Sequence, residues 1–412
     1  MKESSWPLWP GAVWRRAGHD DRGVEVTLTR ERLYFDYNAG APLRQEAREA
    51  MVEALGAVGN ASSVHAEGRA ARARIERARG DVAALVGAKA DRVVFTSGGT
   101  EANVTALSQR LRVGAGEIGL DTLLVGASEH PSVLAGGRFQ PGMIETIALD
   151  ANGVVRLDDL AAMLDRLRGE GRRALVSVML ANNETGTIQP LARIAELAHA
   201  FGALVHTDAV QAAGRIAVDI EALGVDMLTL SAHKLGGPQG AGALVLAGDL
   251  VAPLPLLVGG GQEKYNRAGT ENVAAIAGFG AAAAAARADL DRADLWRAWR
   301  DQLSALPHAI VIGAGAERLP QTVALAVEGL KAETLVIALD LEGVAVSAGS
   351  ACSSGKVRVS HVMRAMQLPE AQAASAIRIS FGWKTGHEDL TMVRDVWERV
   401  VSRLLPRARH AA

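Results

Sequence analysis

The stretch Thr229-Leu-Ser-Ala-His-Lys-Leu-Gly-Gly-Pro-Gln-Gly-Ala-Gly242 decides the fold. It continues an apolar run, residues 226–230, that reads as a buried strand, and it ends in a glycine-rich turn. Lys234 therefore lies just past the end of a buried strand, where an ammonium group is costly unless it has a partner. A lysine in a surface turn would give the same pattern, so other parts of the chain are needed to choose between the two.

Composition restricts the class of protein. The chain has 412 residues, of which 49% are hydrophobic and 22% charged, and this indicates a globular chain of two or three domains. Its net charge of -2 gives no basic excess for nucleic acid or an anionic membrane. The single cysteine excludes an intrachain disulfide and fits a reducing cytoplasm. The apolar stretch 273–286 is shorter than the ~20 residues of a membrane span, so we expect a core helix there.

Seven apolar runs alternate with helical patterns over residues 92–246. They predict an α/β fold with a mainly parallel, seven-stranded sheet wrapped by helices. Helices are predicted over 45–55, 66–85, 157–167 and 191–200. The predicted strands are 93–95, 122–125, 144–148, 175–180, 204–207, 227–230 and 243–246.

The texture of the sequence changes after residue 281. A long alanine- and charge-rich helix is expected over 281–306. Strands at 322–327 and 377–381, with helices over 332–341, 360–366 and 387–404, then predict a smaller α+β domain. We therefore expect a large domain over 44–285 and a small domain made of 31–43 and 286–412. Residues 1–30 show no helical or strand period and are expected to form a poorly ordered extension.

Three polar segments follow strands and should meet at one edge of the sheet. Thr96-Ser-Gly-Gly-Thr100 joins a strand to a helix, a place that suits a phosphate, although plain capping by Ser97 or Thr100 is the alternative. Asp208 and Lys234 each end a strand. An amine that forms an imine with an aldehyde, and a carboxylate that keeps a pyridine nitrogen protonated, are parts of a pyridoxal 5'-phosphate (PLP) site. The three segments together predict such a site.

Other segments add candidate residues, each with a structural alternative. His130 follows the strand 122–125, and a lone histidine is usually structural. Asn183 lies in Asn182-Asn-Glu-Thr-Gly186, which also fits a tight turn. Arg378 on an apolar strand suits a carboxylate clamp or an internal ion pair. Thr270 ends the glycine-rich loop 259–270 and could reach a phosphate, including one in a neighbouring subunit.

The only cysteine, Cys352, lies in Ser347-Ala-Gly-Ser-Ala-Cys-Ser-Ser-Gly355. Small polar neighbours predict an exposed, mobile loop over about 347–359. An unpaired exposed thiol is a liability, which a reactive thiolate would justify. An accidental surface cysteine is the alternative.

Seven motifs, taken in order, resemble those of the cysteine desulfurases of the NifS/IscS kind, within the fold-type I, class V aminotransferase-like PLP enzymes. The resemblance covers about residues 33–399. The motifs are Phe35-Asp-Tyr-Asn-Ala, Thr96-Ser-Gly-Gly-Thr-Glu, Glu129-His, Ala181-Asn-Asn-Glu-Thr-Gly, His206-Thr-Asp-Ala-Val-Gln, Ser231-Ala-His-Lys and Gly349-Ser-Ala-Cys-Ser-Ser-Gly.

The resemblance implies roles for single residues. Lys234 would bond the cofactor and shuttle protons, with His130 stacked on the ring and assisting. Asp208 would pair the ring nitrogen, and Gln211 would bond the phenolic oxygen. Arg378 would bind the substrate carboxylate. Asn183 would contact cofactor and substrate, and the phosphate would be held by Gly99, Thr100, Ser231 and His233, with Thr270 from the partner subunit of a homodimer.

The implied activity is conversion of L-cysteine to L-alanine. Cys352 would be the nucleophile that keeps the sulfur as a persulfide, and a candidate transient iron–sulfur ligand; no resident metal is expected. The sulfur would pass to an acceptor or iron–sulfur scaffold protein for cluster or thio-cofactor synthesis. A selenocysteine lyase or a class V aminotransferase on the same scaffold is the alternative. The basic segment Lys356-Val-Arg-Val359 departs from the family pattern and leaves the acceptor open.

Overall fold

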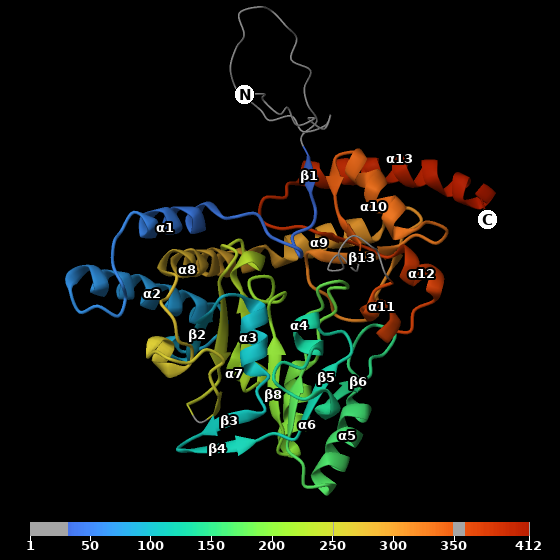
Figure 1. The fold of residues 1–412 in the computed structure, drawn as a ribbon. Coiled ribbons are helices and arrows are strands. Elements are labelled where there is room, and N and C mark those ends of the chain that lie inside the picture. The colour runs from blue at the N-terminus through green and yellow to red at the C-terminus, as the bar shows by residue number, and fades with distance from the viewer. Residues whose placement is uncertain (1–31, 250, 349–358, 412) are drawn as a thin grey trace, which may run out of the picture.

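The computed structural model describes residues 32–249, 251–348 and 359–411 (Figure 1). The predicted extension over 1–30 and Cys352 therefore lie outside the described residues.

The core of the fold is a seven-stranded sheet in the order β2-β10-β9-β8-β7-β5-β6. Its strands are β2 (Val93–Thr96), β10 (Gly242–Leu246), β9 (Met227–Ser231), β8 (Leu204–Asp208), β7 (Ala174–Ser177), β5 (Thr122–Gly126) and β6 (Ile144–Ile147). Strand β10 is antiparallel to both of its neighbours, and the other strands share one direction. The predicted α/β fold with a mainly parallel sheet is confirmed, and each strand overlaps its predicted range.

Helices cover the sheet, whose strands other than the edge strand β6 are almost wholly buried. Helices α1 (Gln45–Leu55), α2 (Ala66–Leu85) and α8 (Val273–Ala288) lie side by side (Figure 1). Small residues permit this packing: a Cβ on Gly280 of α8 would lie 2.5 Å from the Cα atom of Ala78 in α2. Helices α3 (Gly99–Ala106), α4 (Pro131–Leu134), α5 (Leu157–Gly169), α6 (Leu191–Ala200) and α7 (Ile220–Leu223) complete the layers.

The predicted long helix over 281–306 is wrong in detail. Helix α8 ends at Ala288, a tighter 3₁₀ turn spans Asp289–Arg292, and α9 (Ala293–Ser304) follows. At this turn the Arg44 guanidinium donates to Asp289 at 2.6 Å. Residues 273–304 are long and apolar enough to cross a membrane by length and composition alone. However, Ile276 and Phe279 of α8 are buried in the core, as expected for a core helix.

A second cluster of buried hydrophobic residues forms around a four-stranded antiparallel sheet. Its strands are β12 (Ile310–Val311), β13 (Thr322–Ala326), β16 (Ile377–Ser380) and β15 (Ser347–Ala348). Helices α9, α10 (Ala332–Leu341) and α13 (His387–Ala411) supply buried side chains, Trp397 among them. Two further short helices are α11 (His361–Ala365) and α12 (Glu370–Ser375).

Two small sheets complete the fold, and β1 (Leu33–Tyr34) lies where the segment 32–38 predicts a short strand. Strand β1 pairs in parallel with β14 (Val344–Ala345) and ties the start of the described chain to the second cluster. Strands β3 (Arg110–Val113), β4 (Gly116–Gly119) and β11 (Val251–Pro253) form an antiparallel sheet at one end of the molecule (Figure 1). Much of β3 and β4 is exposed, so these strands lack the apolar run that marks a buried strand.

Candidate active site

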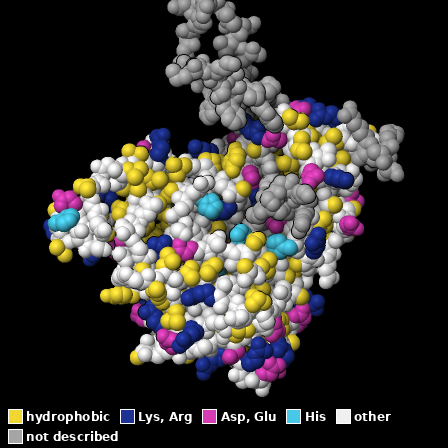
Figure 2. Space-filling model, in the orientation of Figure 1, with side chains coloured by type: hydrophobic (Ala, Val, Ile, Leu, Met, Phe, Trp, Pro, Cys, Tyr) yellow, Lys and Arg dark blue, Asp and Glu magenta, His cyan; other side chains and the backbone are white. Residues whose placement is uncertain are grey.

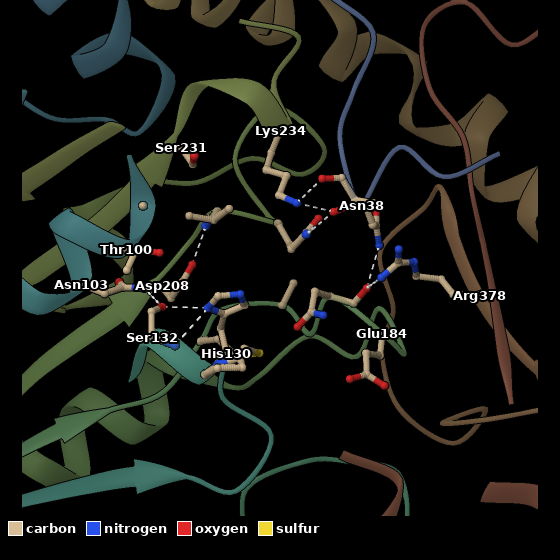
Figure 3. Close-up of a pocket in the computed structure, with 18 of the residues that line it drawn as sticks. Asn38, Thr100, Asn103, His130, Ser132, Glu184, Asp208, Ser231, Lys234 and Arg378 are labelled. Atoms are coloured by element: carbon tan, nitrogen blue, oxygen red, sulfur yellow. Dashed lines mark hydrogen bonds between the residues drawn. The ribbon is translucent and has the colours of Figure 1, made fainter. Parts of the chain in front are cut away.

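The predicted residues meet in one cavity of about 670 Å³ (Figure 3). Strands β2, β5, β7, β8 and β9 share a direction, so the segments after them lie at the same edge of the sheet. Residues 38–39 and 359–361 close the cavity from the other side. Every predicted site residue that the structure describes, apart from Thr270, lines it: Gly99, Thr100, His130, Asn183, Asp208, Gln211, Ser231, His233, Lys234 and Arg378.

The Lys234 amine is directed into this cavity from the 3₁₀ turn after β9 (Figure 3). Its Nζ atom donates to the backbone carbonyls of Asn38 and Ala39 at 2.6 and 2.7 Å. Gln211 donates to the same Asn38 carbonyl at 3.0 Å. The segment after β1 is thus the partner that a lysine at a buried strand end requires, and it places the amine at the cavity wall.

Two hydrogen-bond donors hold the Asp208 carboxylate at the end of β8. The Val210 backbone N–H donates to Oδ1 at 2.9 Å, and the Asn103 side chain donates to Oδ2 at 2.8 Å. The first contact is the local turn bond expected of any aspartate after a strand. The second contact comes from α3 and has no local explanation, and it fixes the carboxylate at the cavity.

His130 caps α4 and faces the same cavity. Its Nδ1 atom lies 2.8 Å from Ser132 Oγ and 3.2 Å from the Ser132 backbone nitrogen. Burial lowers the pKa of His130, although the Asp208 charge opposes this shift. The ring is therefore held neutral near pH 7.

The small residues after β2 leave room for a ligand at the N-terminus of α3. A Cβ on Gly99 would lie 3.3 Å from the side chains of Ser231 and Val210, and a Cβ on Gly242 would lie 2.4 Å from the Gly98 carbonyl carbon. Gly98 occupies the N-cap position and no side chain caps the helix, so capping by Ser97 or Thr100 is wrong. The first N–H groups of α3 remain for a ligand.

Ser231 and His233 line the cavity beside the N-terminus of α3. Ser231 Oγ lies 2.9 Å from His233 Nδ1. Burial, together with the Lys234 and Arg215 charges, lowers the pKa of His233 to about 4. His233 is thus neutral at physiological pH and offers hydrogen bonds without a charge of its own.

Arg378 takes part in an internal ion pair and also lines the cavity. Its Nη2 atom donates to Asp36 at 2.5 Å, and its Nη1 atom donates to the Asn183 carbonyl at 2.9 Å. Its Nε–H has no partner among the described residues. A guanidinium carries five N–H groups, so capacity remains for a carboxylate in the cavity.

Thr270 lies apart from the cavity within this chain. It lines a separate hollow with Ser97 and Arg267, and Arg267 donates to Glu101 at 3.0 Å. Cys352 lies outside the described residues. The residues next to its segment are placed: Ser347 pairs with Arg378 in the sheet register, and Ser360 and His361 line the cavity.

Sequence reasoning gave no role to several residues at the cavity. Asn38 and Asn103 hold Lys234 and Asp208 across long separations in the chain. Glu184 is buried at the cavity with Oε2 unpartnered among the described residues. Nε2 of His361 in α11 donates to the Glu129 backbone carbonyl at 3.0 Å. Among these residues only Glu184 had a signal in the sequence, because it lies in the polar run Asn182-Asn-Glu184.

Comparison with known proteins agrees with this geometry. The family model for aminotransferase class-V matches residues 33–393. A cysteine desulfurase of Cereibacter sphaeroides is 41% identical over 91% of this chain and 97% of its own. The cysteine desulfurase NifS of Azotobacter vinelandii is 37% identical over 88% of this chain and 90% of its own. A NifS-like protein from Rickettsia africae ESF-5 superposes with a TM-score of 0.78 at 30% identity, over 90% of this chain and 100% of its own.

The chain therefore belongs to the aminotransferase class-V family, whose cysteine desulfurase members are PLP enzymes. The same relatives, similar over nearly their whole length, show which activity within the family this chain has. Its function is that of a cysteine desulfurase, which mobilises sulfur from cysteine. The predicted resemblance and activity are confirmed. The alternatives, a selenocysteine lyase or an aminotransferase, receive no support.

Proposed function

We propose that this chain binds PLP covalently through Lys234 and desulfurates L-cysteine by way of Cys352. The convergence of the Lys234 amine and the Asp208 carboxylate on one cavity is the observation that carries the proposal. The residues fit the cofactor: an amine for its aldehyde, a carboxylate for its ring nitrogen, and a glycine-lined helix start for its phosphate. When bound, PLP supplies an electron sink for the substrate's α-carbon.

Each predicted residue has a place in this proposal. Gly99, Thr100, Ser231 and His233 hold the phosphate, and Gln211 bonds the phenolic oxygen. His130 would lie against the ring, and Asn183 would contact both cofactor and substrate. The unused N–H groups of Arg378 bind the substrate carboxylate. Because His130 is neutral near pH 7, it can assist proton transfer with its ring N–H, while the Lys234 amine accepts a proton and returns it.

Cys352 is the proposed sulfur carrier. Its sulfur bonds to the substrate sulfur while the substrate Cβ–S bond breaks. In sum, L-cysteine and the Cys352 thiol give L-alanine and a Cys352 persulfide, so atoms and electrons balance. The proposal is supported by the residues on both sides of segment 349–358, since Ser347 pairs with Arg378 and Ser360 lines the cavity. A role of Cys352 as a transient iron–sulfur ligand belongs to the same proposal.

A homodimer is proposed because apolar side chains remain exposed on and after α1. Val52 and Leu55 are 63% and 72% exposed, and Val58 and Val64 are 83% and 88% exposed. Figure 2 shows hydrophobic side chains gathered over this helix. A second copy seated there would cover them and bring a Thr270 to the phosphate of its neighbour. Sedimentation velocity tests this point, because a monomer at micromolar concentration would contradict it.

Three further parts of the proposal complete the biological setting. The sulfur acceptor is a partner protein, such as an iron–sulfur scaffold. The compartment is the cytoplasm, where a lone thiol stays reduced. The chain divides into a PLP-binding domain over 44–285 and a small domain made of 31–43 and 286–412, which has a hydrophobic cluster of its own around Trp397.

The test incubates the purified protein with L-cysteine under reductant and measures alanine and sulfide. Borohydride reduction, followed by peptide mass spectrometry, locates the cofactor. We expect equimolar products, with the cofactor on Lys234. Cys352→Ala should keep the PLP absorbance and lose sulfide release, whereas Cys352→Ser serves as the isosteric control for the thiol. Unchanged sulfide release in both variants would reject the persulfide step, and PLP on another lysine would reject the site.

A further inference from the structure

Asn103 of α3 is the centre of a buried hydrogen-bond network that reaches both Asp208 and His130 (Figure 3). Its side chain is 1% exposed. The Nδ2 atom donates to Asp208 Oδ2 at 2.8 Å and to Ser132 Oγ at 2.9 Å. Its Oδ1 atom accepts from Thr229 Oγ1 at 2.5 Å. Both amide protons are therefore in use.

The direction of each bond in one branch follows from the carboxylate. An ionised carboxylate only accepts, so the Nδ2 side of the Asn103 amide must face Asp208. The Thr229 proton is then committed to Asn103, and Thr229 Oγ1 accepts from His206 Nε2 at 3.3 Å. His206 Nδ1 in turn accepts from the Ser177 hydroxyl at 2.8 Å. Burial lowers the pKa of His206 to about 3, which leaves the single ring proton that this pattern requires.

The second branch fixes the tautomer of His130. Ser132 Oγ accepts from Asn103, so its own proton is free for His130 Nδ1 at 2.8 Å. The Ser132 backbone N–H donates to the same nitrogen at 3.2 Å. Nδ1 is therefore an acceptor and the ring proton sits on Nε2. The other edge of the ring is turned toward the cavity (Figure 3).

We propose that Asn103 is a positioning residue that sets the Asp208 carboxylate and the His130 tautomer at once. The proposal rests on the PLP site proposed above. A carboxylate that loses a donor rotates more freely and binds a proton more readily. It would then hold the protonated ring nitrogen of the cofactor less well. Both amide protons and the amide oxygen of Asn103 are bonded to other side chains, so its effect passes through Asp208 and His130.

Two matched variants on α3 test the first half of this idea. Asn103→Leu keeps the shape of the side chain and removes every polar atom. Thr105→Val is the control, because Thr105 is buried on the same helix but bonds only to the Glu101 carbonyl of that helix through its hydroxyl. We expect PLP to bind Asn103→Leu about 10- to 100-fold more weakly, the usual loss for a hydrogen bond to a charged group. The control should match the wild type.

The pH profile separates positioning from simple loosening of the fold. In Asn103→Leu the acid limb of kcat/KM should move to higher pH, and kcat should fall more than KM rises. Loosening alone would lower activity at every pH without moving the limb. An affinity and a pH profile equal to those of Thr105→Val would overturn the proposal.

A measurement on the unmodified protein tests the second half, even if Asn103→Leu fails to fold. Nitrogen-15 NMR of histidine-labelled full-length protein, with and without PLP, reports which ring nitrogen carries the proton. We expect Nε2–H for both His130 and His206 between about pH 6 and 8. A proton on Nδ1 of His130 would refute the bond directions. A wild type that binds no PLP would reject the proposed function, while the NMR result would still decide on the network.

Discussion

Glu184 should make the stability of this protein depend on pH in a way that one substitution removes. The residue follows β7, is 4% exposed, and lines the cavity with Oε2 unpartnered among the described residues. Burial raises the pKa of its carboxyl to about 7, against the opposing effects of the Ser360 hydrogen bond and the Arg378 charge. The perturbation is Glu184→Gln, which resembles the protonated acid in shape and cannot ionise.

The magnitude follows from the shift in pKa. The unfolded carboxyl has the ordinary value of 4.5, so between about pH 4.5 and 7 the folded state holds a proton that the unfolded state releases. Stability therefore falls as pH rises through this window, by about 1.36 kcal/mol for each unit. Two and a half units give roughly 3 kcal/mol. Glu184→Gln should match the wild type near pH 4.5 and exceed its stability by roughly 3 kcal/mol at pH 8.

The assay is urea unfolding of both proteins at several pH values, with the difference in free energy of unfolding plotted against pH. Taking the difference cancels the contributions of other titrating groups. Glu196→Gln, an exposed change on α6, is the control and should give a flat line. A flat line for Glu184→Gln as well would refute the reasoning. So would a variant that is less stable than the wild type at pH 8.

Three further predictions concern buried charge and backbone strain. Arg215 is buried beside Gln211 and Asn38, and burial lowers its pKa to about 9. Arg215→Met should free both side chains and cut alanine formation about 10-fold. The rate is measured against the wild type at equal PLP loading. Glu263 binds Arg79 in a buried, two-pronged ion pair at 2.6 and 2.9 Å, so Glu263→Ala should cost about 3–5 kcal/mol in urea unfolding, and the double variant Arg79→Met/Glu263→Leu should recover most of it. Gln367 has a φ of 55° just after α11, where the Leu368 N–H reaches the Met363 carbonyl, so Gln367→Gly should stabilise the protein by about 0.5–1 kcal/mol, and a lower thermal midpoint would contradict this.

The sequence was sufficient for the central sheet because its strands, apart from the edge strand β6, are buried on both faces. Such strands appear as continuous apolar runs, and the polar residues that follow them mark one edge. Strands β3 and β4 were missed since Arg110, Arg112 and Glu117 interrupt their apolar residues, so neither strand shows a continuous apolar run. The 3₁₀ turn at Asp289–Arg292 was missed because its residues include no helix-breaking glycine or proline.

Site residues could be predicted from the sequence where a charged side chain stands in an unusual position. Lys234 and Asp208 stand out because charge at a buried strand end needs an explanation. Asn38 and Asn103 do not stand out, because an asparagine in a loop or a helix is ordinary. Their roles come from partners at Lys234 and Asp208, more than a hundred residues away. Such contacts have no local signature.

The antiparallel strand β10 limits how the sequence around the site can change during evolution. It begins a few residues after Lys234 and lies between β9 and β2, with Gly242 packed against Gly98. Strand β10 therefore holds both the Lys234 segment and the start of α3 in place. An insertion or deletion in residues 235–241 would displace both together. The distance between the Lys234 amine and the N-terminus of α3 should therefore tolerate changes of length in the outer loops, but not in residues 235–241.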